Sequence, residues 1–75
     1  MGFNNQPYIK IGLKIAYYRK LNELTQEQLA EAIHRTPSYL SQVESPSKAQ
    51  PISLEMLFSI ADALQVPPAK FLEDL

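Results

Sequence analysis

The sequence predicts an all-α fold, a compact domain of five helices. Apolar residues repeat at helical spacing along most of the 75 residues, and glycine occurs only twice. No stretch alternates polar and apolar residues for long enough to indicate a strand. A chain of this length buries only about 60% of its unfolded surface, so we expect one domain with a thin core.

The first helix is expected over residues 8–22, where Ile11, Ile15 and Tyr18 form a core-facing stripe. Gly12 lies inside this helix and lowers its intrinsic stability, which favours close packing at that position. Residues 1–7 are expected to be a flexible N-terminal arm, and the folded domain is expected to cover 8–75.

The C-terminal part predicts two more helices. Ser53 is placed to cap a helix over 54–64, and Pro67-Pro68 end it and begin a short fifth helix that stops near residue 72. The apolar stripe of the longer helix comprises Leu54, Leu57, Ile60, Ala61 and Leu64.

Two short helices with separate caps are expected between residues 25 and 45. Thr25 and Gln28 fit a capping box for the first of them. Thr36 is the expected N-cap of the second, about 37–44, and Pro37 occupies its first turn, where a missing N–H does no harm. So short a link makes the helices cross steeply, as in a helix-turn-helix. The shared contacts are expected from Leu29, Ile33, Leu40 and Val43.

The other face of the 37–44 helix carries Ser38, Ser41 and Gln42, followed by Ser45. These side chains are short or of medium length, uncharged and able to form hydrogen bonds, as a helix that enters the major groove requires. Gln42 could pair both amide atoms with adenine. The alternative is a merely solvated face, but such a face normally carries Lys or Glu, and this one has neither.

Further residues are expected at the phosphates or at the rim of the groove. They are Gln26, Arg35, Thr36, Tyr39 and Lys48. For Gln26 and Lys48 an ordinary solvent-exposed role is an open alternative. His34 is better explained as a residue that tolerates a left-handed turn after the preceding helix than as a DNA contact.

Charge is unevenly distributed along the chain. The formal net charge is −1, but residues 1–48 sum to about +2 and residues 49–75 to about −3, counting Lys and Arg against Asp and Glu. DNA binding depends on the local field rather than on the total charge. An ordinary solvated surface would give the same totals.

Composition argues against several classes of protein. There is no cysteine and only one histidine, so neither a disulfide framework nor a metal site is expected, and no cofactor is implied. No Ser or Cys is spaced with the histidine as in a catalytic triad, and no Gly-rich phosphate loop occurs, so no catalytic residue is assigned and no enzyme is expected. No apolar run approaches the roughly 20 residues that span a bilayer, and no signal peptide is expected, because residues 1–7 lack a basic segment and an apolar stretch.

Three motifs in order resemble the Cro and phage-repressor type helix-turn-helix family, also called the xenobiotic-response-element family. They are Leu24-Thr25-Gln26-Glu27-Gln28-Leu29-Ala30, Tyr39-Leu40-Ser41-Gln42-Val43-Glu44 and Ile60-Ala61-Asp62-Ala63-Leu64-Gln65-Val66. The resemblance covers roughly residues 10–73. It implies a lambda-repressor-like fold that binds double-stranded DNA as a homodimer on a palindromic operator, in a cytoplasmic protein of prokaryotic or phage-like type.

The resemblance also implies residue roles. Gln26 would contact phosphate, and Pro37, Ser38 and Gln42 would face the bases. Arg19 would pair with Glu44, which would hold the first helix to the recognition helix, and Lys48 would lie in a phosphate-contacting loop.

The sequence departs from the family pattern at three places. His34 replaces the usual turn glycine, which implies backbone strain, and Pro37 replaces a polar base reader. Leu13, Tyr17 and Leu21 form a second apolar stripe where relatives are usually charged. The stripe is either covered by the N-terminal arm through Phe3 or Tyr8, or it is a partner surface.

The sequence therefore predicts a sequence-specific transcriptional regulator, most simply a repressor, with no small-molecule ligand and no membrane partner. A protein-interaction module, such as an antitoxin-like partner, is the alternative. The acidic C-terminal third and the second stripe of the first helix motivate it.

Overall fold

A computed structural model describes residues 5–75 and confirms the all-helical class. Four α-helices are present: α1 (Gln6–Leu21), α2 (Gln26–Ala32), α3 (Pro37–Glu44) and α4 (Leu54–Leu64). A 3-10 turn, η1 (Pro68–Phe71), follows them, and the described part of the chain contains no strand. None of the helices in residues 5–75 has the length and apolar character needed to cross a membrane.

The predicted short fifth helix is present only as the 3-10 turn η1, not as an α-helix. Its closing bonds run from Lys70 N to Pro67 O and from Leu72 N to Ala69 O, both 3.0 Å long. Four residues are too few to close a run of i to i+4 bonds, and Pro68 has no N–H to contribute.

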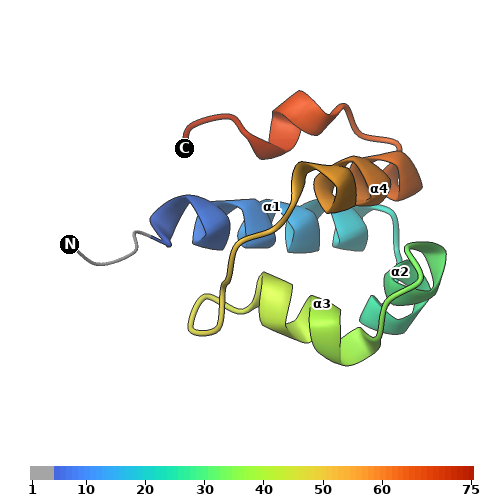
Figure 1. The fold of residues 1–75 in the computed structure, drawn as a ribbon. Helices are drawn as coiled ribbons and strands as arrows, with labels where there is room; N and C mark the ends of the chain where they lie inside the picture. The colour runs from blue at the N-terminus through green and yellow to red at the C-terminus, as the bar shows by residue number, and fades with distance from the viewer. Residues whose placement is uncertain (1–4) are drawn as a thin grey trace.

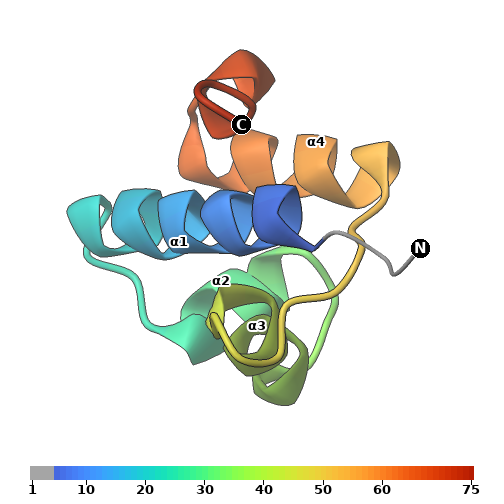
Figure 2. The ribbon, with the colours of Figure 1, turned by 90° about the vertical axis from the view of Figure 1, so that its left-hand side faces the viewer.

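Helix α1 lies in the middle of the molecule. Both views place α4 and η1 on one side of it and the α2–α3 pair on the other (Figures 1 and 2). The chain therefore folds back twice across α1, and the described N-terminal end lies on the same side as the C-terminus (Figure 1).

Every element contributes to a single core around α1. Ile15, Leu29, Leu40, Ile60 and Phe71 are completely buried. The Phe71 ring meets Tyr18 edge-on, with ring centroids 5.4 Å apart, which attaches η1 to α1.

The capping predictions for the internal helices are confirmed. Thr25 and Gln28 form the capping box of α2, Thr36 caps α3, and the Ser53 Oγ accepts from Met56 N at 3.0 Å. Helix α1 begins at Gln6, two residues before the predicted start, so the last two residues assigned to the arm are helical. Of the remaining residues assigned to the arm, Asn5 is the N-cap residue of α1, and residues 1–4 lie outside the described part.

Gly12 sets how closely α1 approaches α3. A Cβ atom at this position would overlap the carbonyl oxygen of Val43. The close packing predicted from a glycine inside the first helix is therefore present, and it brings α1 against the C-terminal half of α3.

One member of the predicted α4 stripe does not belong to the core. Leu54 is 61% exposed, whereas Leu57, Ile60 and Leu64 are buried. Leu54 is the first residue of α4, at the edge of the face that packs on α1, so periodicity alone overstates its burial.

Candidate nucleic-acid interface

The turn between α2 and α3 is built from two capping interactions. At the start of α2, Gln28 N donates to Thr25 Oγ1 at 3.1 Å and Thr25 N donates to Gln28 Oε1 at 2.8 Å. At the start of α3, Tyr39 N donates to Thr36 Oγ1 at 3.1 Å. Because each helix has its own cap, four connecting residues, 33–36, suffice to join them.

His34 supplies the left-handed residue in this connection, with φ at 58°. The next N–H, from Arg35, reaches back to Ala30 O at 2.9 Å and closes the C-terminus of α2. The predicted structural role of His34 is present. In residues 5–75, no three His, Asp or Glu side chains are grouped as a metal site would require.

The outward face of α3 brings the four predicted base-facing residues together. Pro37, Ser38, Ser41 and Gln42 are all exposed, while Leu40 and Val43 on the opposite side are buried. Ser45, which the spacing also placed on this face, is half-buried, and its Oγ bonds to the Ser47 Oγ at 3.1 Å. The free face is therefore shorter than the sequence suggested and ends at Gln42.

An ion pair between Arg19 and Glu44 holds α3 to α1. Arg19 Nε donates to Glu44 Oε2 at 2.9 Å and Arg19 Nη2 to Glu44 Oε1 at 3.0 Å, so the contact is bidentate. Both residues are buried, and Arg19 Nη1 also donates to Leu24 O at 2.6 Å. The pairing implied by the family resemblance is present in this chain.

Gln26 takes part in the same cluster, which sequence reasoning did not foresee. Its Nε2 donates to Glu44 Oε1 at 3.0 Å. The carboxylate therefore accepts from three donors on two helices, and no buried side-chain polar atom among the described residues lacks a partner. The side chain of Gln26 braces α2 against α3, while its contact with a phosphate stays a prediction.

Basic residues flank the free face of α3 at both ends. Arg35 precedes the helix and Lys48 follows it, and both are exposed. The only acidic residue within α3, Glu44, is neutralised by Arg19. The outward side of α3 therefore carries no unpaired negative charge that would repel a phosphate backbone.

Tyr39 lies at the rim beside Arg35 and is half-buried. The Arg35 guanidinium carbon is 5.9 Å from the centre of the Tyr39 ring. Burial raises the pKa of Tyr39 above its ordinary value, and the charge of Arg35 opposes part of that rise. The hydroxyl therefore remains protonated and can donate a hydrogen bond at neutral pH.

A loop residue joins this face without any signal in the sequence. Gln50, between α3 and α4, donates from its Nε2 to Gln42 Oε1 at 3.4 Å. The two residues are eight positions apart, and only the path of the loop brings them together.

The second apolar stripe of α1 is exposed. Leu13, Tyr17 and Leu21 are 48%, 58% and 60% accessible. Tyr8 does not cover them, because it packs against the core beside Ile11. Phe3, the other predicted cover, lies outside the described residues.

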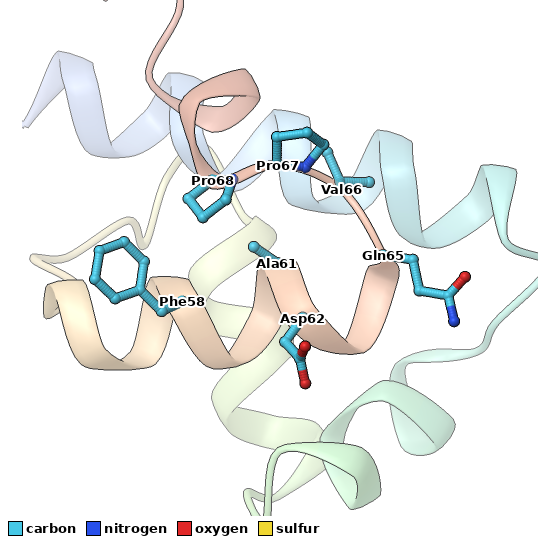
Figure 3. Close-up of a pocket in the computed structure, with 7 residues that line it drawn as sticks. All are labelled: Phe58, Ala61, Asp62, Gln65, Val66, Pro67 and Pro68. Atoms are coloured by element: carbon cyan, nitrogen blue, oxygen red, sulfur yellow. The ribbon is translucent and has the colours of Figure 1, made fainter.

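A second exposed apolar surface adjoins α4. Phe58 and Pro68 flank a hollow with Ala61 between them, while the side chains of Asp62 and Gln65 point away from it (Figure 3). Phe58 is 51% exposed and lies one turn beyond Leu54. The predicted core stripe of α4 left Phe58 out, but it included Leu54, which is also exposed.

Comparison with known families identifies a family with this arrangement of helices. A family model described as helix-turn-helix, of Cro/C1 type, matches residues 15–71. The chain belongs to this family. The match includes α2, the turn and α3, together with both partners of the Arg19–Glu44 pair. No curated protein sequence matches the chain significantly.

Solved structures of transcription regulators share the fold. The clp gene regulator ClgR from Corynebacterium glutamicum has a TM-score of 0.82 at 29% identity, with 92% of this chain and 87% of that chain covered. The restriction-modification controller protein C.AhdI from Aeromonas hydrophila gives 0.76 at 28%, covering 85% and 94%. The biofilm master regulator SinR, solved in complex with DNA, gives 0.75 at 32%, covering 84% and 98%. Family and neighbours together support a DNA-binding transcriptional regulator.

Proposed function

We propose that this Cro/C1-type protein is a sequence-specific transcriptional regulator that inserts α3 into the major groove of DNA. The observation that carries the proposal is the outward face of α3, where Pro37, Ser38, Ser41 and Gln42 are exposed together. A groove about 12 Å wide admits a helix, and short side chains let it approach the base edges. Pro37 offers apolar contact only, whereas the other three can form hydrogen bonds.

The basic residues on either side of this face have a different role from the residues that face the bases. Arg35 and Lys48 are exposed next to the ends of α3 and would contact phosphates, which adds affinity without adding sequence information. Thr36 and Tyr39 would lie at the rim. Because the outward face of α3 is uncharged, most of the electrostatic affinity must come from these flanks.

Fluorescence anisotropy on operators selected from a random DNA pool tests this division. Gln42→Ala should relax the preference at one base pair, because its bonds go to a base edge. Lys48→Ala should weaken binding to all sequences alike and lower the salt slope by about one. Absence of salt-sensitive DNA binding by the wild-type protein at low ionic strength would overturn the proposal, and equal losses on every operator variant for both mutants would overturn the division of labour.

We further propose repression, because it needs only occupancy of a site. Activation needs an additional contact with the transcription machinery. A reporter gene placed behind the selected operator should lose expression when the protein is supplied, and increased expression would refute repression.

We also propose that the protein binds a palindromic operator as a homodimer. Its two subunits would meet through the α4 surface around Phe58. A two-fold interface places the same patch on both subunits, so the Phe58 ring of one could enter the hollow beside Ala61 and Pro68 of the other. Leu54, one turn away, extends the apolar area.

Sedimentation equilibrium with Phe58→Ser tests this interface. The variant should shift the protein towards monomer and weaken binding to a two-half-site operator more than to a single half-site. Tyr17→Ser is the matched control, because Tyr17 is similarly exposed, 58% against 51%, on a different face. A wild-type protein that stays monomeric on the full operator would contradict the proposal.

The exposed stripe of α1 favours a protein-binding role as a second candidate function. Leu13, Tyr17 and Leu21 are spaced for one helix face, and α1 has three lysines outside the core and no acidic residue, while its one arginine is buried against Glu44. The partner best suited to it is an acidic amphipathic helix. Such a peptide should bind the protein in a salt-sensitive way and lose affinity for Tyr17→Ser but not for Phe58→Ser. Equal binding to both variants would argue against this surface.

A further inference from the structure

We propose that Gln50 is a positioning residue that restrains the amide of Gln42 and thereby sharpens its base preference, although Gln50 itself need not touch DNA. This inference rests on the proposed reading of a base edge by Gln42. Its starting point is the hydrogen bond from Gln50 Nε2 to Gln42 Oε1, 3.4 Å long.

Both ends of this bond are held by the fold. Gln42 precedes Val43 and Glu44, which fix the end of α3 against Gly12 and Arg19 of α1. The backbone that carries Gln42 is therefore rigid with respect to the rest of the domain.

The backbone at Gln50 is restricted as well. A turn bond from Lys48 N to Ser45 O, 3.2 Å long, closes the start of the loop. Pro51 follows Gln50 and confines its backbone to extended conformations. The donor group of Gln50 is thus presented from a limited set of positions.

An amide group that is free in solvent can rotate by a half-turn and exchange its oxygen with its nitrogen. The bond to Gln50 couples the two amides, because a half-turn of Gln42 alone would bring its NH2 group against the NH2 group of Gln50, and the bond is kept only when both amides turn together. In the arrangement that the structure shows, the oxygen of Gln42 lies on the loop side, and one of its lone pairs and both Nε2 hydrogens are available.

This coupling of the two amides has a consequence for base recognition. Adenine offers a donor at N6 and an acceptor at N7 in the major groove, and a glutamine amide pairs with both only when its oxygen and nitrogen face the correct atoms. Gln50 makes a reversal of the Gln42 amide depend on a matching reversal of its own amide, so it restrains the order that Gln42 presents to a base pair. An unrestrained amide would sample both orders and discriminate less.

The bond joins two exposed side chains, so its effect on preference should be modest. Gln42→Ala should remove about 5- to 150-fold discrimination at the contacted base pair, the range for a bidentate contact. Gln50→Ala should reduce discrimination at the same base pair by about two- to fivefold, as expected for one solvent-exposed hydrogen bond.

The decisive experiment is a double-mutant cycle on operators that vary at this base pair. Binding is measured by fluorescence anisotropy for wild type, Gln42→Ala, Gln50→Ala and the double variant. Gln50→Ala should change the preference only when Gln42 is present. If Gln50→Ala leaves the preference intact, or changes it equally in the Gln42→Ala background, the positioning role is refuted.

Gln50→Glu adds a test of direction. A carboxylate only accepts hydrogen bonds, so it would pair with Nε2 of Gln42 and reverse the amide. The preferred base should then change at that position, beyond the uniform loss of affinity that a new negative charge causes. Lys48→Ala is the control from the same loop, and it should weaken all sequences without changing the preferred base.

A measurement without DNA separates this inference from the proposed function. In the free protein, Gln50→Ala should shift the side-chain amide resonances of Gln42 in NMR spectra, whereas Lys48→Ala should not. Unchanged Gln42 amide resonances would overturn the inference. If Gln42→Ala leaves the base preference unchanged while the resonance shift is still observed, the base-reading role proposed above is overturned instead.

Discussion

Replacing Arg19 by Met should destabilise the domain strongly, because it leaves the buried carboxylate of Glu44 without its positively charged partner. Arg19 and Glu44 are 8% and 9% exposed. The substitution removes both hydrogen bonds to the carboxylate, 2.9 and 3.0 Å long, and the 2.6 Å bond to Leu24 O. Glu44 then keeps only the donor from Gln26.

The expected loss is a large part of the total stability. Breaking one partner of a buried pair costs about 3–5 kcal/mol. A domain of this size is typically stable by about 4–11 kcal/mol, from 0.05–0.15 kcal/mol per residue. At about 4–8 °C per kcal/mol, the melting temperature should fall by roughly 12–40 °C.

Far-UV circular dichroism during thermal and urea unfolding measures this effect. Lys20→Met is the matched control, since Lys20 is the exposed neighbour of Arg19 and its replacement should change stability by less than about 0.5 kcal/mol. The variant with Met at both 19 and 44 should recover most of the loss, because neither charge remains buried alone.

Two results would refute the reasoning. An unchanged melting curve for Arg19→Met would mean that the ion pair does not hold α1 to α3. A double variant as unstable as the single one would mean that packing of the arginine stem, rather than the stranded charge of Glu44, accounts for the loss.

Three further substitutions test the elements that position α3. Gly12→Ala should destabilise by about 1–3 kcal/mol in urea unfolding, since overpacking against Val43 O outweighs the better helix propensity of alanine; a more stable variant would contradict the close approach. His34→Gly should raise the melting temperature by a few degrees, because it relieves a left-handed residue that costs about 1–2 kcal/mol, and a lower melting temperature would show that His34 makes a compensating contact. Thr36→Ala should cost about 1 kcal/mol through loss of the cap on Tyr39 N, while Thr36→Ser should retain stability; equal losses for both would argue against the cap.

The local sequence determined where the internal helices begin and end. Thr36 with Pro37 predicted α3, and Ser53 predicted α4, because capping depends on residues within four positions of each other. The inward residues of α3 followed from periodicity for the same reason. The other residues of α3 form its outward face, so this face could also be predicted from the sequence.

The Arg19–Glu44 pair came from family resemblance rather than from local pattern. Its partners are 25 positions apart, and spacing alone gave no reason to join them. The structure supplied the geometry and added Gln26 as a third donor to the carboxylate.

Tertiary structure alone decided the features that depend on how segments meet. Periodicity counted Leu54 as core, but packing of α4 on α1 leaves it exposed. Nothing local indicated that Gln50 lies against Gln42, since their contact depends on the path of the whole loop. The sequence thus determined which side chains α3 presents, because a helix fixes the direction of its own side chains. Which neighbour bonds to the amide of Gln42 was decided by the tertiary structure, because only the folded chain brings Gln50 within hydrogen-bonding distance.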